Sequence, residues 1–135
     1  MAFQGNFTCD SFKEALFKAD VDFLVDTIKI ALYDNTATLN ASTTAYTTVG
    51  EVVASGYAAG GNTLTPTVAL ANGISYVDFG NTSWSAAITA RGALIYKSGG
   101  TAICVLDFGS DKTSTTTFTV EFPTNTSNSA LIRLS

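Results

Sequence analysis

The stretch that decides the fold is Thr27-Ile28-Lys29-Ile30-Ala31-Leu32-Tyr33, where the sequence changes to a β pattern. Ile28, Ile30 and Leu32 alternate with Lys29, Ala31 and Tyr33, which is the period of two of a half-buried strand. The same alternation returns in Phe118-Thr119-Val120-Glu121-Phe122. We therefore expect antiparallel β structure from about residue 27 onward.

Turn-forming residues divide the rest of the chain into short strand candidates. Asn72-Gly73 lies between two alternating runs and is the strongest hairpin signal, because Asn and Gly tolerate the positive φ of a tight turn. We expect strands at residues 27–33, 46–53, 63–70, 73–79, 88–97, 102–109, 116–122 and 130–134. The side chains expected in the core include Ile28, Ile30, Leu32, Leu94, Tyr96, Val105, Phe118, Val120 and Ile132.

A helical pattern occurs only near the N-terminus. Ser11 and Glu14 have the spacing of a capping box, in which each side chain satisfies a backbone N–H of the first helical turn. Phe12, Ala15, Leu16 and Ala19 follow at the spacing of one buried helix face. The pattern predicts a short helix over about residues 11–20.

Composition supports one β domain. Hydrophobic residues make up 46% of the 135 residues and charged residues only 13%, which is too apolar for a disordered chain. The 21 threonines and 12 serines suit the exposed face of a twisted sheet. We expect an all-β fold, a single antiparallel β-sandwich of jelly-roll or Ig-like type with one short N-terminal helix. Residues 1–26 are expected to form an N-terminal arm and the helix, and residues 27–135 the sandwich.

Charge and hydropathy argue against two classes of partner. The net charge is −4 and the seven Lys and Arg residues are scattered, so nothing supplies the basic surface that nucleic-acid binding needs. The longest apolar runs, such as residues 102–106, are far shorter than the ~20 residues that cross a bilayer. We expect a soluble protein that binds neither nucleic acid nor membrane.

The N-terminal residues have no positively charged and apolar signal pattern, so the expected site of synthesis and folding is a reducing cytoplasm. In that setting Cys9 and Cys104 are expected to be two buried free thiols, with a disulfide as the alternative.

Catalytic and metal-binding patterns are weak. The chain has no histidine, which removes the commonest general base and imidazole metal ligand. A carboxylate pair among Asp78, Asp107 and Asp111 is the remaining catalytic option, although Asp is commoner in turns. Residues 34–36 and 109–111 carry oxygen ligands for a hard cation but lack the spacing of a calcium loop. We expect no enzyme activity, no cofactor and no metal.

Aromatic residues are the best candidates for contacts with other molecules. Phe3 and Phe7 lie in an N-terminal segment without a pattern of its own, and either bind a neighbouring subunit as an assembly arm or pack on their own domain. Phe12 and Trp84 complete the set of candidate interface residues. Trp84 is expected as a core side chain, with a sugar-binding surface shared with Tyr57 and Tyr76 as the alternative.

Several blocks of the sequence resemble a family of small virion proteins of tailed bacteriophages. The blocks are Ile30-Ala31-Leu32-Tyr33, Ala37-Thr38-Leu39-Asn40-Ala41-Ser42-Thr43-Thr44-Ala45-Tyr46-Thr47, Glu51-Val52-Val53-Ala54-Ser55-Gly56-Tyr57-Ala58-Ala59-Gly60-Gly61, Thr89-Ala90-Arg91-Gly92-Ala93-Leu94-Ile95-Tyr96 and Ala102-Ile103-Cys104-Val105-Leu106-Asp107-Phe108-Gly109-Ser110-Asp111-Lys112. The resemblance covers about residues 11–134. It implies a part of a virion without specifying which part, and it supplies no catalytic motif.

We therefore expect a virion structural protein, specifically a capsid decoration (cement) protein bound to the lattice of the major capsid protein, or to another virion protein. A homo-oligomer is expected, with a trimer favoured, because capsid lattices offer repeated symmetric positions. The alternatives are a neck, collar or tail-fibre module and, less favoured, a carbohydrate-binding module.

Overall fold

The computed structural model describes residues 3 and 5–134, and its fold is mostly β with one short helix. The N-terminal part contains β1 (Phe7–Thr8), α1 (Asp10–Phe17) and β2 (Ile28–Tyr33). A long loop then leads to β3 (Asn62–Thr63), β4 (Pro66–Ala71), β5 (Ile74–Phe79) and β6 (Thr82–Trp84). The last strands are β7 (Thr89–Lys97), β8 (Ala102–Thr113), β9 (Phe118–Val120) and β10 (Ile132–Leu134).

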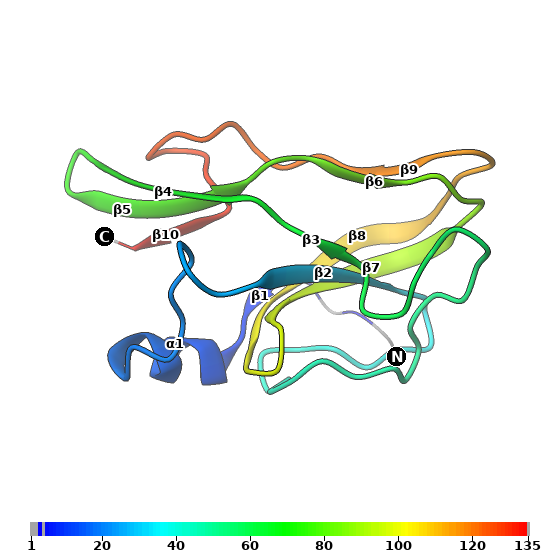
Figure 1. Cartoon of the computed structure of the whole chain (residues 1–135), viewed down its shortest axis with the longest axis horizontal. Coiled ribbons are helices and arrows are strands. Elements are labelled where there is room, and N and C mark those ends of the chain that lie inside the picture. Colours follow the sequence, from blue (N-terminus) through cyan, green and yellow to red (C-terminus); the bar gives the residue numbers. More distant parts are fainter. Residues whose placement is uncertain (1–2, 4, 135) are drawn as a thin grey trace.

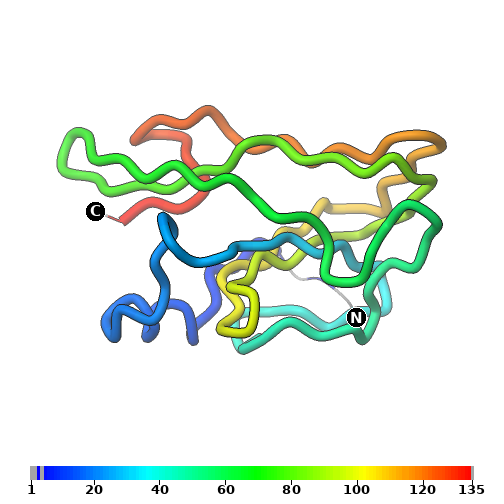
Figure 2. The backbone as a smooth tube through the Cα atoms, viewed as in Figure 1, coloured from blue at the N-terminus to red at the C-terminus, as the bar shows by residue number. Residues whose placement is uncertain are grey.

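The strands form three antiparallel sheets. Five strands pair in the order β1-β8-β7-β2-β3, three in the order β10-β5-β4, and β6 pairs with β9. Figure 1 shows the two smaller sheets side by side along one face of the five-stranded sheet. Figure 2 shows the chain passing from one of the smaller sheets to the other. The largest pairing, β7 with β8, joins residues that are close in sequence through the turn at residues 98–101.

The predicted core is largely confirmed, but the half-buried alternation of β2 is wrong. Ala31 and Tyr33 are as buried as Ile30 and Leu32, because the loop at residues 34–61 covers their face of the strand, where the Tyr33 hydroxyl donates to the Thr47 carbonyl. Of the nine side chains expected in the core, all but Ile132 are buried, and Ile132 packs partly exposed against the same core.

Asn72 and Gly73 have φ values of 55° and 77°, so the β4–β5 hairpin is closed by the expected type I′ turn. Cys9 and Cys104 are both buried free thiols, as predicted.

The predicted capping box does not form. The helix begins one residue earlier, at Asp10, and Cys9 takes the N-cap position without a side-chain cap. The Ser11 hydroxyl instead bonds the Thr101 hydroxyl at 2.7 Å, and Glu14 pairs with Lys18 at 3.5 Å. The reason is tertiary: the Cys9 N–H donates to the Ile103 carbonyl, which ties the start of the helix to β8.

The predicted strand at residues 46–53 is also absent. Only the isolated bridge of Glu51 with Tyr33 occurs there, and Ala45, just before the segment, bridges Thr101. The segment bends because the Glu51 side chain turns inward, where it accepts hydrogen bonds from Tyr46 and Tyr57. Side-chain hydrogen bonds here replace a backbone ladder.

The division at residue 26 does not separate the N-terminal residues from the β structure. β1 pairs with β8, Phe7 opposite Val105 and Thr8 opposite Cys104. Phe3 and Phe12 are buried in the common core. Residues 1, 2 and 4 of the predicted arm, and Ser135, lie outside the described residues.

Candidate functional site

Six exposed apolar side chains belong to elements at one end of the molecule, which we call the apolar end. It consists of Leu16, Phe17, Leu24, Val25, Leu70 and Leu134. Figure 1 shows α1, the loop that follows it, the β4–β5 turn and β10 at this same end. Phe17 is 96% exposed, and the free energy lost by leaving a phenylalanine in water is about 1.5–3 kcal/mol. Such a set of exposed apolar side chains is typical of a surface that contacts another macromolecule.

A groove of about 560 Å³ opens between α1 and β10 at the apolar end. Its helix side carries Phe12, Lys13 and Leu16, and its strand side carries Ile132, Arg133 and Leu134; Thr8, Ile74 and Leu131 complete the lining. Phe12 is buried beneath the groove, and the lining combines apolar side chains with Thr8 and the two cationic side chains, Lys13 and Arg133.

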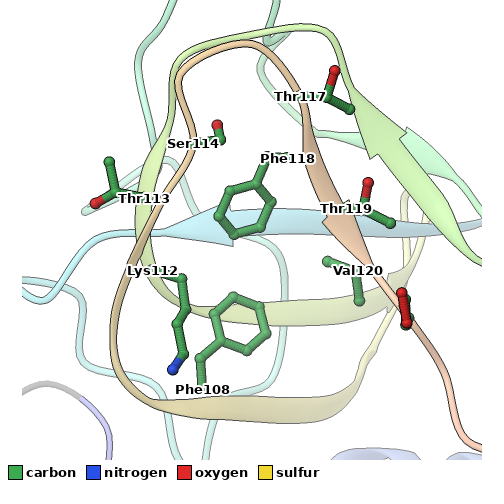
Figure 3. A pocket seen from close by; sticks show the side chains of 9 residues that line it. Phe108, Lys112, Thr113, Ser114, Thr117, Phe118, Thr119 and Val120 are labelled. Atoms are coloured by element: carbon green, nitrogen blue, oxygen red, sulfur yellow. The ribbon is translucent and has the colours of Figure 1, made fainter.

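A second pocket, of about 430 Å³, lies between the far end of β8 and β9 (Figure 3). Its floor holds the rings of Phe108 and Phe118, whose centroids are 6.2 Å apart. Figure 3 shows polar side chains around the two rings, among them Lys112 and Thr119. An apolar floor with a rim of hydroxyls has the chemistry that a sugar ring requires, since one face is apolar and the edge carries hydroxyls.

Glu51 and Asp78 are the two buried carboxylates among the described residues, and Glu51 is only 7% exposed. Its carboxylate accepts hydrogen bonds from the hydroxyls of Tyr46 and Tyr57 and, at 2.8 Å, from the N–H of Gly60. The Tyr57 hydroxyl in turn accepts from the N–H of Leu32 at 2.9 Å. These contacts satisfy a buried carboxylate with neutral donors, so the group anchors the 34–61 loop and is closed to solvent.

The three aspartates considered for catalysis each bond to different partners. Burial raises the pKa of Asp78, whose Oδ1 accepts from the N–H of Phe79. Asp107 pairs with Arg91 at 3.1 Å; burial raises its pKa, but the hydrogen bond from Gly109 and the Arg91 guanidinium outweigh burial and lower it. Asp111 accepts from the Asn35 amide at 3.2 Å. Among the described residues, no hydrogen bond joins any two of these aspartates.

The two segments that carry oxygen ligands do meet, through Asn35 and Asp111, although residues 109–111 belong to strand β8 and do not form the expected turn. Within the described part of the chain, however, no three His, Cys, Asp or Glu side chains group in a way that could hold a metal ion. Over the same residues, no helix is long and apolar enough to cross a membrane.

The candidate interface residues do not form a surface. Phe3, Phe12 and Trp84 are buried within the chain's own core, and Phe7 is half-buried in β1 against β8. The structure therefore takes the alternative in which the N-terminal phenylalanines pack on their own domain. The proposed sugar surface of Trp84, Tyr57 and Tyr76 is wrong as well, because Trp84 and Tyr57 are buried against each other with ring centroids 5.8 Å apart.

Sequence reasoning missed the apolar end. Phe17 lies outside the predicted buried face of the helix, which is made by Phe12, Ala15 and Leu16. A phenylalanine outside that face was the available signal of an exposed apolar side chain. Leu24, Val25 and Leu70 gave no comparable signal, because exposed and buried leucines look alike in sequence.

Comparison of the chain with protein-family models, with curated proteins and with solved structures finds no match.

Proposed function

We propose that this chain is a structural component of a virus particle, specifically a decoration protein on the outside of a capsid lattice. The observation that carries the proposal is the apolar end, a set of exposed apolar side chains on a body whose titratable side chains are either paired, buried or scattered. A protein whose function is to bind a lattice needs a contact surface and no catalytic group. The resemblance of the sequence blocks to small virion proteins of tailed bacteriophages supports the same assignment.

We further propose that the three sheets pack as one β-sandwich. Phe108 of β8 and Phe118 of β9 contact each other across the layers, as residues of the inner faces of two packed sheets do. Phe23, in the loop before β2, adds a contact with Phe79 of β5, with ring centroids 6.1 Å apart. A rigid sandwich would hold the apolar end in a fixed geometry for binding.

The apolar end predicts which side chains are needed for incorporation into particles. Particles that contain this chain would be purified with wild-type protein or with Phe17→Lys and Leu24→Lys variants, and the chain would be quantified by mass spectrometry. We expect at least about a tenfold loss of occupancy, because burying the ammonium group of a lysine in an apolar contact costs free energy.

Val53→Lys is the matched control, since Val53 is 97% exposed and lies outside the apolar end. Normal occupancy of the Phe17→Lys and Leu24→Lys variants would refute the proposed contact surface. A copy number near that of the lattice-forming protein indicates decoration, whereas a far smaller one indicates the neck, collar or tail-fibre alternative.

A further inference from the structure

Strand β4 forms a free edge of the three-stranded sheet. Residues Pro66–Ala71 pair with β5 on one side, and in the described part of the chain no strand pairs with the other side. A free edge exposes backbone N–H and C=O groups that can pair with another strand, so most proteins protect such edges with charges, prolines or bulges. In β4 only Pro66, at its start, is a residue of that kind.

The register identifies the backbone groups that face outward. Ala71 and Ile74 flank the two-residue turn and so form a hydrogen-bonded pair, and such pairs alternate along an antiparallel ladder. Thr67, Ala69 and Ala71 therefore direct their N–H and C=O groups to β5. Val68 and Leu70 direct theirs to the free edge.

The side chains beside this edge are apolar and uncharged. Val68 and Leu70 lie on the same face of the sheet, and Leu70 is 73% exposed. No charged residue occurs anywhere between Glu51 and Asp78. The chain as a whole carries a net charge of −4, so this edge is a place where two copies can approach without bringing like charges together.

We propose that β4 pairs antiparallel with β4 of a second copy of this chain. The two-fold axis of this pairing passes midway between Ala69 of one copy and Ala69 of the other. In this register Ala69 lies opposite Ala69 of the second copy. Val68 exchanges hydrogen bonds with Leu70 of the second copy, and Leu70 with Val68. Pro66, which has no N–H, falls opposite Asn72 beyond the ladder, and small alanines at the axis leave room for close approach.

Two-fold pairing closes the assembly. Each copy has one β4 edge, and an isologous contact uses both edges, so the product is a dimer and not a filament. This geometry favours a dimer over the trimer expected from capsid lattices. The inference goes beyond the proposed function and does not depend on it, because the edge and its residues are the same whatever the particle.

The first test is the mass of the purified full chain, measured by analytical ultracentrifugation over a dilution series. A contact of one strand lies at the small end of protein interfaces, so we expect a dimer that dissociates on dilution. Leu70→Lys places lysines from both copies at the shared face, and we expect the dimer dissociation constant to rise by at least about tenfold.

Leu134→Lys is the matched control. Leu134 and Leu70 both lie opposite Ser75 on the same face of the same sheet, but Leu134 belongs to the other edge strand. Its substitution should leave dimerisation unchanged. A chain that is monomeric at its highest soluble concentration, or equal loss in both variants, would overturn the proposal.

The second test fixes the register by disulfide cross-linking. Residues at the axis form a non-hydrogen-bonded pair with Cα atoms about 4.5 Å apart, within reach of a disulfide. Ala69→Cys should therefore give a covalent dimer under mild oxidation, while Thr67→Cys, which lies opposite Ala71, should not. Cys9 and Cys104 are buried, so they do not compete. Equal cross-linking of the two variants would contradict the register.

Discussion

The Phe3 side chain occupies space that Gly92 of β7 leaves open. A Cβ at position 92 would lie 2.4 Å from the Phe3 ring and 2.5 Å from the Leu106 carbonyl oxygen, so only glycine allows this contact. Phe3 is 2% exposed, whereas Phe17, in α1, is almost fully exposed. Two phenylalanines near the N-terminus thus have opposite roles, one in the core and one on the surface.

We therefore expect Phe3→Ala to lower the free energy of unfolding by about 3–5 kcal/mol, because it leaves a cavity among buried side chains. Phe17→Ala should change that free energy by less than about 0.5 kcal/mol. Denaturant unfolding of the two variants measures both values. Equal stabilities would mean that the N-terminal segment does not belong to the core.

At the scale of elements, the entry to β3 depends on close contact between two backbones. Gly61 precedes β3 with a φ of 77°, and a Cβ there would lie 1.8 Å from the Ile30 carbonyl oxygen of β2. Gly99, in the turn between β7 and β8, has nearly the same φ of 75°, but nothing lies within 4 Å of its Cβ position. The two glycines share a backbone conformation and differ only in how crowded their Cβ positions are.

This pair predicts a difference between two alanine variants. Gly99→Ala should cost about 1 kcal/mol, the penalty for an L-residue at positive φ. Gly61→Ala should cost about 3 kcal/mol or more, since β3 must also move away from β2. Thermal unfolding of both variants gives the comparison, and a Gly61→Ala protein as stable as Gly99→Ala would contradict the β2–β3 pairing.

At the scale of the whole molecule, tyrosines connect the 34–61 loop to the five-stranded sheet. Tyr33 of β2 donates to the Thr47 carbonyl at 2.6 Å, and Tyr96 of β7 donates to the Gly60 carbonyl at 2.7 Å. Tyr46 stacks on Tyr96 with ring centroids 4.8 Å apart. Burial, followed by the nearby Glu51 carboxylate, raises the pKa of Tyr96 from 10.0 to about 12.

The raised tyrosine pKa predicts a loss of stability at alkaline pH. An unfolded tyrosine ionises near its ordinary pKa of 10.0, whereas Tyr96 in the folded chain keeps its proton until about pH 12. The unfolded state therefore releases protons first, so stability is full below pH 10 and falls as pH rises toward 12. Burial also raises the pKa of Tyr33, Tyr46 and Tyr57, which adds to the fall.

Denaturant midpoints measured between neutral pH and pH 12 test this, with tyrosinate absorbance recorded on the folded protein. Tyr96→Phe should make the fall shallower, because it removes one of the groups that ionise on unfolding. Ionisation of all tyrosines near pH 10 without unfolding would show that the cluster is open to solvent.

The sequence by itself determined where several of the strands and one tight turn occur. The strand at residues 28–33 and the turn at Asn72-Gly73 depend on neighbours in the chain, and both are confirmed. The absence of histidine likewise follows from the sequence alone. Short-range periodicity shows which side chains share a face, because residue spacing fixes their direction.

Only the tertiary structure decided which of those faces is covered. Ser11 bonds Thr101, 90 positions away, in place of capping its helix, and Glu51 is buried only because Tyr46, Tyr57 and Gly60 surround it. For the same reason, the sequence alone could not tell that Phe3 is buried and Phe17 is exposed. Burial depends on contacts between distant segments, and these arise only when the sheets come together.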